Sequence, residues 1–381
     1  FPPDGERDGS GLRIGIISLG GGFYEDDLRS YFEHHGVEPP KITVVRQTTG
    51  ESEIQRAPVD GCWGDPAPFA AMQAGVDDPA SAGRFPKPLL TQMKWTVEVT
   101  MDVQLVGRLC PGAEIVVYFA ANNNQGEYWA FSEALYGPFR SDVLSCSWGS
   151  FEPGQDQHDR ILEISILDSL LLDAGLLGTT VCVSSGDRGD GSGAGHQPPL
   201  PTVEFPAASP WVLACGGTMF RAGVPQGEEL VWDEDVLGAP MASGGGYSRV
   251  FPRPHWQQAA LTAAQAPDGD GRGVPDVASK ADVTHGFCMM VAGRDVANGG
   301  TSAAAPIWAG LLSLAAARVG ASLGHLNPHL YGSTFGGALC SVDEGTNGCF
   351  HARSGWDPCT GLGSPDWETL GAALEGRTEQ A

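Results

Sequence analysis

Short apolar segments of strand length, alternating with helical ones, constrain the fold of this chain more than any other feature. The expected strands are continuous apolar runs bounded by Gly, Pro or polar residues, at 12–19, 41–46, 113–120, 143–149, 179–186 and 211–217. Helices are expected at 26–36, 95–109, 158–176 and 301–318. Strands buried on both faces read as continuous apolar runs, so the pattern predicts an α/β fold with a doubly wound, mostly parallel sheet flanked by helices.

Two longer stretches lack this alternation. Residues 51–91 are polar and are expected to be loops, whereas 221–300 favour β-structure and loops. A length of 381 residues suggests two or three domains at about 100–200 residues each, although large α/β folds form one core of this size. No repeat or low-complexity linker divides the chain, so a single domain over 1–381 is expected.

The charge balance excludes some partners. The chain has 22 basic against 46 acidic residues, a net charge of −24, which repels nucleic acid and anionic membranes at neutral pH. Either an acidic working environment or a generic solubilising surface explains this excess. No apolar run reaches the roughly 18 residues of a membrane span, so no membrane partner is expected. No heptad or interface helix suggests association, so a monomer is expected.

Ser302 is the strongest candidate nucleophile. It follows Gly299, Gly300 and Thr301 and opens a small, apolar helical segment. A helix N-terminus favours the negative charge that develops during acyl transfer, and preceding glycines let a substrate approach the backbone. The alternative is that Ser302 only caps the helix.

A serine nucleophile needs a base, and the sequence favours a carboxylate over a histidine. Glu98 and Asp102 are four residues apart, so they share one helix face, among apolar neighbours where two exposed carboxylates are not expected. The nearest matches to a histidine that opens a helix, His35 and His285, are weak and indicate surface or loop residues. Asp187 follows the expected strand at 179–186, where open α/β folds place ligand chemistry. A simple turn aspartate is the alternative.

Taken in order along the chain, these segments resemble the sedolisin family of serine-carboxyl peptidases. The matching blocks run from about residue 12 to residue 366. They read LRIGIISLGGGF, EVTMDV, SCSWGS, VSSGDRG, VEFPAASPWVLACGGT, GGGYSRVFPRPHWQ, GVPDVASKADV, GGTSAAAPIWAG and GWDPCTGLGSP.

The resemblance implies a subtilisin-like fold and an acid-active endopeptidase that forms an acyl-enzyme. Ser302 would attack the scissile carbonyl, Glu98 would act as the base, and Asp102 would hold Glu98 in place. Asp187 would stand in the oxyanion hole. Glu25, after the first glycines, aligns with a carboxylate that supports the base in some members.

The resemblance also implies one calcium site within residues 336–366. Asp357 matches a carboxylate ligand, and Arg353 and Gly355 would supply backbone carbonyls. Val342 and Asp343 lie opposite the second family carboxylate, but Asp343 is two places from the family position. A local shift would bring it to the ion; otherwise the site is weakened.

The family further implies secretion as a zymogen, into the extracellular space or an acidic compartment, with peptides or unfolded proteins and its own cleaved prosegment as partners. No signal peptide is visible, and Phe1 would lie near a processed N-terminus. Two of the cysteines Cys340, Cys349 and Cys359 could pair.

Three alternatives stay open: a tripeptidyl-peptidase, a non-catalytic binding relative and a histidine-dependent subtilisin.

Overall fold

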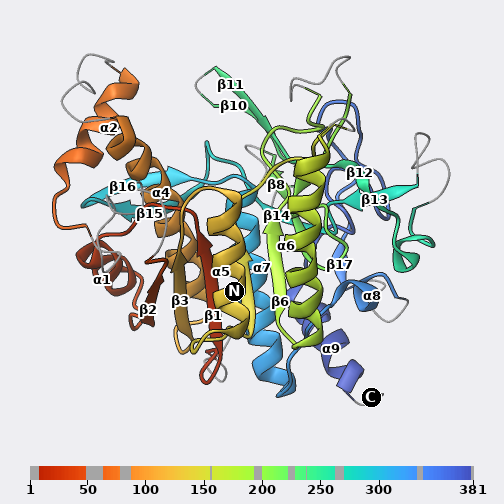
Figure 1. Cartoon of the computed structure of the whole chain (residues 1–381), viewed down its shortest axis with the longest axis horizontal. Helices are drawn as coiled ribbons and strands as arrows, with labels where there is room; N and C mark the ends of the chain where they lie inside the picture. Colours follow the sequence, from red (N-terminus) through yellow and green to blue (C-terminus); the bar gives the residue numbers. More distant parts are fainter. Residues whose placement is uncertain are drawn as a thin grey trace.

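A twisted sheet of eight strands forms the centre of the computed structural model, which describes residues 8–48, 63–77, 87–154, 157–192, 200–221, 228–236, 238–261, 270–332 and 338–378 (Figure 1). Its strand order is β14, β8, β6, β4, β1, β3, β2, and β9 pairs with β8. All pairs are parallel except β8 with β9. The strands are β1 (Arg13–Ser18), β2 (Lys41–Arg46), β3 (Glu114–Phe119), β4 (Val143–Cys146), β6 (Thr180–Ser184), β8 (Leu213–Phe220), β9 (Glu229–Val231) and β14 (Val277–Lys280).

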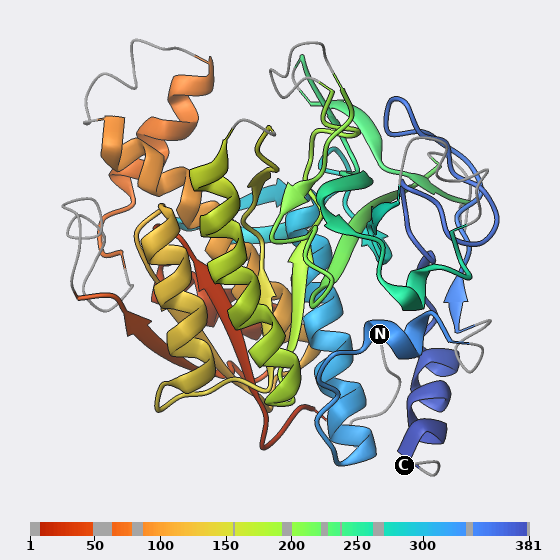
Figure 2. The same ribbon diagram turned by 45° about the vertical axis from the view of Figure 1, so that its right-hand side comes forward.

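Helices cover both faces of this sheet, which confirms the predicted doubly wound fold (Figures 1 and 2). Helices α5 and α6 pack on one face, and α4 and α7 pack on the other. The helices are α1 (Glu25–His34), α2 (Ala67–Asp77), α4 (Lys87–Leu109), α5 (Asn124–Tyr136), α6 (His158–Leu176), α7 (Thr301–Val319), α8 (Asn327–Leu330) and α9 (Trp367–Thr378), with a short 3₁₀ helix at His255–Gln257.

The alternation of side chains along each strand divides the core into two layers. In β3, Ile115 and Val117 join the layer beneath α4 and α7, whereas Val116 and Tyr118 join the layer beneath α5 and α6. All four are fully buried. Both faces of the strand must therefore be apolar, which is why the sequence shows an unbroken apolar run.

Helix α7 is the central helix of the second layer. By length and composition alone it could cross a membrane, but 72% of that apolar stretch is buried inside the protein. It packs against β4, β6, β8 and β14. A helix that is apolar all round is typical of the buried core of a large domain.

Short two-stranded sheets lie outside the central one, and those in 221–300 confirm the β-structure expected there. The pairs are β5 (Ser150–Phe151) with β7 (Glu204–Phe205), β10 (Asp233–Val236) with β11 (Ala239–Ala242), β12 (Gly246–Pro252) with β13 (Gly271–Val274), β15 (Phe287–Val291) with β16 (Arg294–Asn298), and β17 (Leu339–Cys340) with β18 (Ser364–Pro365).

The prediction of loops over 51–91 was wrong for much of the described part of that stretch. Helix α2 lies within it, and α4 begins at Lys87, eight residues before the expected start at 95. Pro88 is the second residue of α4, and the first turn of a helix tolerates proline because the N–H groups of that turn have no acceptor inside the helix. The three C-terminal cysteines, Cys340, Cys349 and Cys359, are all free thiols.

Candidate active site

The carboxyl ends of β1, β4 and β6 meet at one edge of the sheet. After them come the glycines at 20–22, the segment 147–150 and Asp187. The N-terminus of α7 and the middle of α4 contribute Ser302 and Glu98. Parallel strands of an open α/β sheet present their loops to ligands at this edge.

The glycine loop after β1 packs directly on α4, one turn before Glu98. The backbone N–H of Gly21 donates to Gln92 Oε1 at 2.7 Å. A Cβ on Gly20 would lie 2.2 Å from the ring of Trp95, and one on Gly21 would lie 2.7 Å from the Trp95 backbone. Any side chain here would therefore push β1 away from the helix that carries the candidate base.

The structure brings Ser302, Glu98 and Asp102 together. The Ser302 hydroxyl lies beside the Glu98 carboxyl and favours its ionised form, and Glu98 and Asp102 interact electrostatically. Asp102 is fully buried. Glu98 Oε1 and Asp102 Oδ2 are both buried without a hydrogen-bond partner. A proton shared between the two carboxyls would satisfy both oxygens, whereas the alternative of two exposed helix carboxylates does not fit Asp102.

Burial governs the electrostatics of these acids. It raises the pKa of Glu98, which the Ser302 hydroxyl partly offsets and the charge of Asp187 reinforces. Burial, followed by the charge of Glu98, raises the pKa of Asp102 well above its usual value. Burial also raises the pKa of Asp187. Raised carboxyl pKa values keep protons on the site in mild acid.

Ser302 is the second residue of α7 and not its cap. The cap is Gly300, whose φ of 83° suits glycine and which has no side chain to bond. The hydroxyl of Ser302 is thus free of a capping role and reaches Glu98 instead. Its backbone N–H belongs to the first turn, whose N–H groups have no acceptor inside the helix. The helix-cap interpretation of Ser302 was wrong.

Ser147, in the segment after β4, contacts both Asp102 and Ser302. Its hydroxyl lies 2.9 Å from Asp102 Oδ1 and 3.0 Å from the backbone carbonyl oxygen of Ser302. That carbonyl would normally accept from the N–H four residues later, but Pro306 has none. Ser147 was not among the residues predicted from the sequence, although it lies in the block SCSWGS.

Asp187 lies against the start of α7. Its Oδ1 accepts hydrogen bonds of 2.8 Å from both the N–H and the hydroxyl of Thr301. Its Oδ2 would be 2.7 Å from a Cβ on Gly300, so only glycine leaves room for it. Asp187 is therefore more than a turn aspartate, since it joins the β6 loop to the helix of Ser302.

The two candidate histidines and Glu25 lie on the surface or at the end of a helix. The His285 side chain is 70% exposed and sits 3.7 Å from Asp282, and His35 ends α1. The Glu25 side chain is 73% exposed and lies 3.8 Å from Arg29, so the structure places it in a surface ion pair. The hydroxyl of Ser302 has a carboxylate partner, which disfavours the histidine-dependent alternative.

The residues expected to bind calcium lie in two C-terminal loops. Asp357 is fully buried, and its carboxyl accepts bonds from the N–H groups of Cys359 and Thr360 at 2.7 and 2.9 Å. Burial raises the pKa of Asp357 to about 6. Asp343 is exposed and accepts a hydrogen bond from Ser341.

These residues suit a divalent cation at the Asp357 end. A cation would offset the unfavourable burial of the Asp357 charge, and Gly355, two residues before it, is exposed with a φ of 83°. Asp343 could bind the same ion only if its carboxylate gave up the hydrogen bond from Ser341. Arg353 has its N–H 3.4 Å from the Asp357 carboxyl, and Val342 is buried.

Known proteins similar to this chain cover most or all of its length. No protein-family model matches it. Kumamolisin of Bacillus sp. (strain MN-32) is 37% identical over 389 residues, which cover 100% of this chain and 62% of that protein. Human tripeptidyl-peptidase 1 is 36% identical over 304 residues, which cover 72% of this chain and 51% of that protein. The chain thus spans less than two thirds of the length of these relatives.

A solved structure agrees with the fold. Pseudomonas sedolisin, described as a serine-carboxyl proteinase complexed with two molecules of pseudo-iodotyrostatin, superposes with a TM-score of 0.75 at 26% identity. The match covers 97% of this chain and 94% of that one, and confirms the predicted subtilisin-like fold. By sequence and by structure, the chain belongs to the sedolisin family of serine-carboxyl peptidases.

Proposed function

We propose that this chain is an acid-active serine-carboxyl endopeptidase whose catalytic residues are Ser302, Glu98, Asp102 and Asp187. The observation that carries the proposal is the position of Ser302, at the N-terminus of a buried helix, beside the buried carboxyl of Glu98. An activated nucleophile is characterised by such a base within hydrogen-bond reach. A second carboxyl, Asp102, orients that base.

The reaction starts with attack of Ser302 Oγ on the scissile carbonyl carbon. Glu98 takes the hydroxyl proton and passes it to the leaving amine, which leaves an acyl-enzyme on Ser302. Water, deprotonated by the same carboxylate, then hydrolyses the ester. Interacting carboxyls lose their protons in two steps. A Glu98–Asp102 pair holding one proton therefore still offers one carboxylate to Ser302.

Asp187 and the N–H of Ser302 stabilise the oxyanion of each tetrahedral intermediate. Both Thr301 donors engage Asp187 Oδ1, so the proton of the neutral acid would be held by Oδ2, beside Gly300. Only the protonated acid donates a hydrogen bond, because an ionised carboxylate would repel the oxyanion. The raised pKa of Asp187 thus fits activity in acid.

Hydrolysis of an unfolded protein across pH 3–8 tests this function. We expect wild-type activity in acid, and a loss of at least about 10⁴-fold for Ser302→Ala, as for other serine-protease nucleophiles. Glu98→Gln should lose most activity at every pH. Ser313→Ala, deeper in the same helix, is the matched control and should retain activity. Unchanged activity of Ser302→Ala would rule out this mechanism, and no wild-type activity would favour a non-catalytic binding protein.

A paired substrate separates endopeptidase from tripeptidyl-peptidase activity. Relatives that match this chain are named tripeptidyl-peptidases, so this alternative is specific. One peptide is used with a free and with an acetylated N-terminus. An endopeptidase cleaves both, whereas an exopeptidase releases tripeptides only from the free form.

The proposal extends to the setting of the enzyme. Calcium bound by Asp357, with carbonyls of Arg353 and Gly355, would join the C-terminal loops. Val342 and Asp343 would complete the site. We also propose a monomer that acts outside the cell or in an acidic compartment after loss of a prosegment, which rests on the family resemblance.

A further inference from the structure

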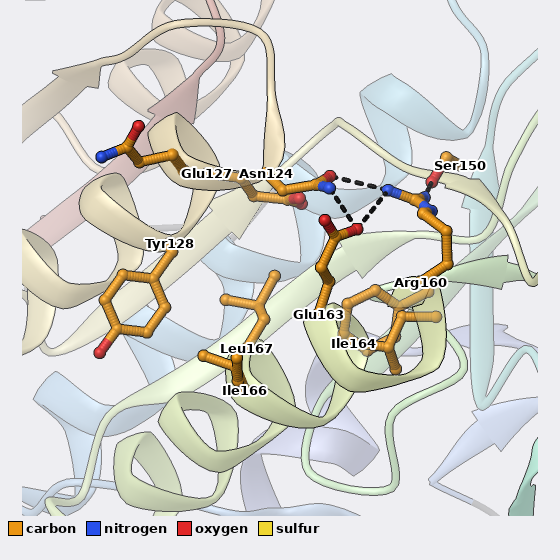
Figure 3. Close-up of a pocket in the computed structure, with 11 residues that line it drawn as sticks. Asn124, Glu127, Tyr128, Ser150, Arg160, Glu163, Ile164, Ile166 and Leu167 are labelled. Carbon is orange, nitrogen blue, oxygen red and sulfur yellow. Dashed lines mark hydrogen bonds and ion pairs between the residues drawn. The ribbon is translucent and has the colours of Figure 1, made fainter. Parts of the chain in front are cut away.

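A cavity of about 280 Å³ lies between α5 and α6, beside the catalytic edge of the sheet (Figure 3). Ile164 and Leu167 of α6 and Phe205 of β7 form its apolar wall. Glu127, from the first turn of α5, and Ser150 also line it. None of the functions proposed above uses this cavity.

The cavity is within reach of a peptide bound at Ser302. Ser150 is three residues after Ser147, which contacts Asp102 and Ser302. Three residues of chain span at most about 10 Å, which is no more than the length of three residues of an extended substrate. The charges of Glu127, Asp102 and Glu98 all act on the thiol of Cys146, at the end of β4. Glu127 and the triad therefore flank the same strand end.

One charge in the cavity is unbalanced. Arg160 donates to Asn124 Oδ1 at 2.8 Å and to Ser150 Oγ at 3.0 Å, and it pairs with Glu163 at 3.4 Å. Dashed lines in Figure 3 join these four residues. In the part of the chain that the structure describes, the Glu127 carboxyl has no hydrogen bond or ion pair. The guanidinium of Arg160 thus already contacts Asn124, Ser150 and Glu163.

We propose that this cavity binds a lysine or arginine side chain of the peptide substrate, with the cation at Glu127 and the aliphatic stem against Ile164 and Leu167. The inference rests on the proposed peptidase function and adds a substrate class to it. Burial raises the pKa of Glu127 to about 7, although Arg160 lowers it. A bound cation would relieve that cost and favour the ionised carboxylate.

A cleavage-site profile is the first test. Wild-type enzyme and Glu127→Gln digest the same unfolded proteins, and mass spectrometry reads the residues around each cut. We expect lysine and arginine to be enriched about tenfold at one position within four residues of the scissile bond. Glu127→Gln should lose that enrichment at that position alone. Glu163→Gln, which alters an already paired carboxylate of the same cavity, should keep it.

The outcomes distinguish this inference from the proposed function. Cleavage without cationic enrichment at any position overturns the cavity assignment and leaves the peptidase intact. Enrichment that survives Glu127→Gln also overturns it, since another residue must then bind the cation. A wild-type enzyme that cleaves nothing overturns both proposals.

Direct binding provides a readout that does not need turnover. On a Ser302→Ala background, calorimetry compares peptides that differ only in lysine or norleucine at the enriched position. Lysine should bind about tenfold more tightly, and Glu127→Gln should equalise the two. The charged or titratable neighbours are Arg160 and Glu163 of α6 and Cys146 of β4. Because Glu127 loses its proton as the pH rises toward 7, the lysine preference should grow between pH 4 and 7. A preference that is absent at both pH values contradicts the inference.

Discussion

Ser147 places one hydroxyl between Asp102 and the backbone of the proposed nucleophile, Ser302. Ser147→Ala removes both contacts, and small misplacement of catalytic groups is costly. We expect kcat to fall by about 10²-fold with little change in KM. Because Ser147 lowers the pKa of Asp102, the pH profile should shift to higher pH. Steady-state kinetics across pH 3–8 measure both. Ser147→Thr keeps a hydroxyl and should recover most of the activity; equal loss in both variants would point to packing instead.

Asp187 allows a sharper test of its protonation. The acid must be neutral to donate a hydrogen bond, whereas an amide donates at every pH. Asp187→Asn should therefore retain more of its own maximal activity above pH 6 than the wild type does, even with a lower maximum. Asp187→Ala lacks any donor and should lose about 10²–10³-fold in turnover. Identical alkaline limbs for the wild type and Asp187→Asn would show that Asp187 does not set the pH range.

At the scale of elements, α7 lacks the helical hydrogen bond that the Ser302 carbonyl would accept from residue 306. Pro306 leaves the Ser302 carbonyl to Ser147. Pro306→Ala supplies the missing N–H, and one such bond contributes about 1 kcal/mol, or about 1–2 °C in melting temperature for a chain of 381 residues. We expect this gain together with about tenfold lower kcat/KM, because the carbonyl no longer needs Ser147. Thermal unfolding on a Ser302→Ala background avoids self-digestion. A less stable variant would contradict this reasoning.

The C-terminal loops provide the second test at this scale. If calcium joins them at Asp357, chelation should lower the melting temperature by several degrees, and added calcium, but not magnesium, should restore it. Asp357→Asn should remove the response. Asp343→Asn decides whether the displaced carboxylate takes part, since an uninvolved Asp343 leaves the response unchanged. No effect of chelator on the wild type would refute the calcium site.

At the scale of the whole molecule, buried carboxyls predict greater stability in acid. Burial raises the pKa of Glu204 to about 7, and it raises the pKa values of Glu98 and Asp187. A carboxyl whose pKa is raised in the folded state contributes its full stabilisation of the fold below its unfolded pKa, which is near 4.5 for Glu. This stabilisation is lost as the pH rises through the pKa of the folded state. The melting temperature should thus fall by at least about 5 °C from pH 4.5 to pH 8.

Other groups limit this stability at low pH, and salt tests its cause. A hydrogen bond from Thr43, followed by one from Lys41, lowers the pKa of Glu114 to about 2. That contribution is present above the unfolded pKa and is lost as the pH falls toward 2. Surface repulsion from the net charge of −24 would also weaken the fold at pH 8. Salt at 0.5 M screens surface charges but not buried ones, so a difference that vanishes in salt would contradict the buried-carboxyl explanation.

Local patterns in the sequence were sufficient for most strands of the central sheet and for helices α1, α4, α6 and α7. Strand β2 has the bounds 41–46 and α6 has the bounds 158–176, both as predicted, because apolar runs and helix limits are properties of neighbouring residues. Helices α5, α8 and α9 were not predicted, and neither were helix α2 and the first turns of α4, which contain proline. Proline is ambiguous there, since it both breaks helices and begins them, and only packing against the rest of the fold settles the choice.

The sequence by itself determined the chemical groups of the site, and the tertiary structure decided their arrangement. Ser302, Glu98, Asp102 and Asp187 were recognisable from motifs, because each motif is a contiguous piece of backbone. The role of Ser147 depends on β4, α4 and α7 meeting at one edge of the sheet, and the unpaired charge of Glu127 depends on which groups Arg160 contacts. Such relations join residues far apart in the chain, so they exist only once the fold has brought those residues together.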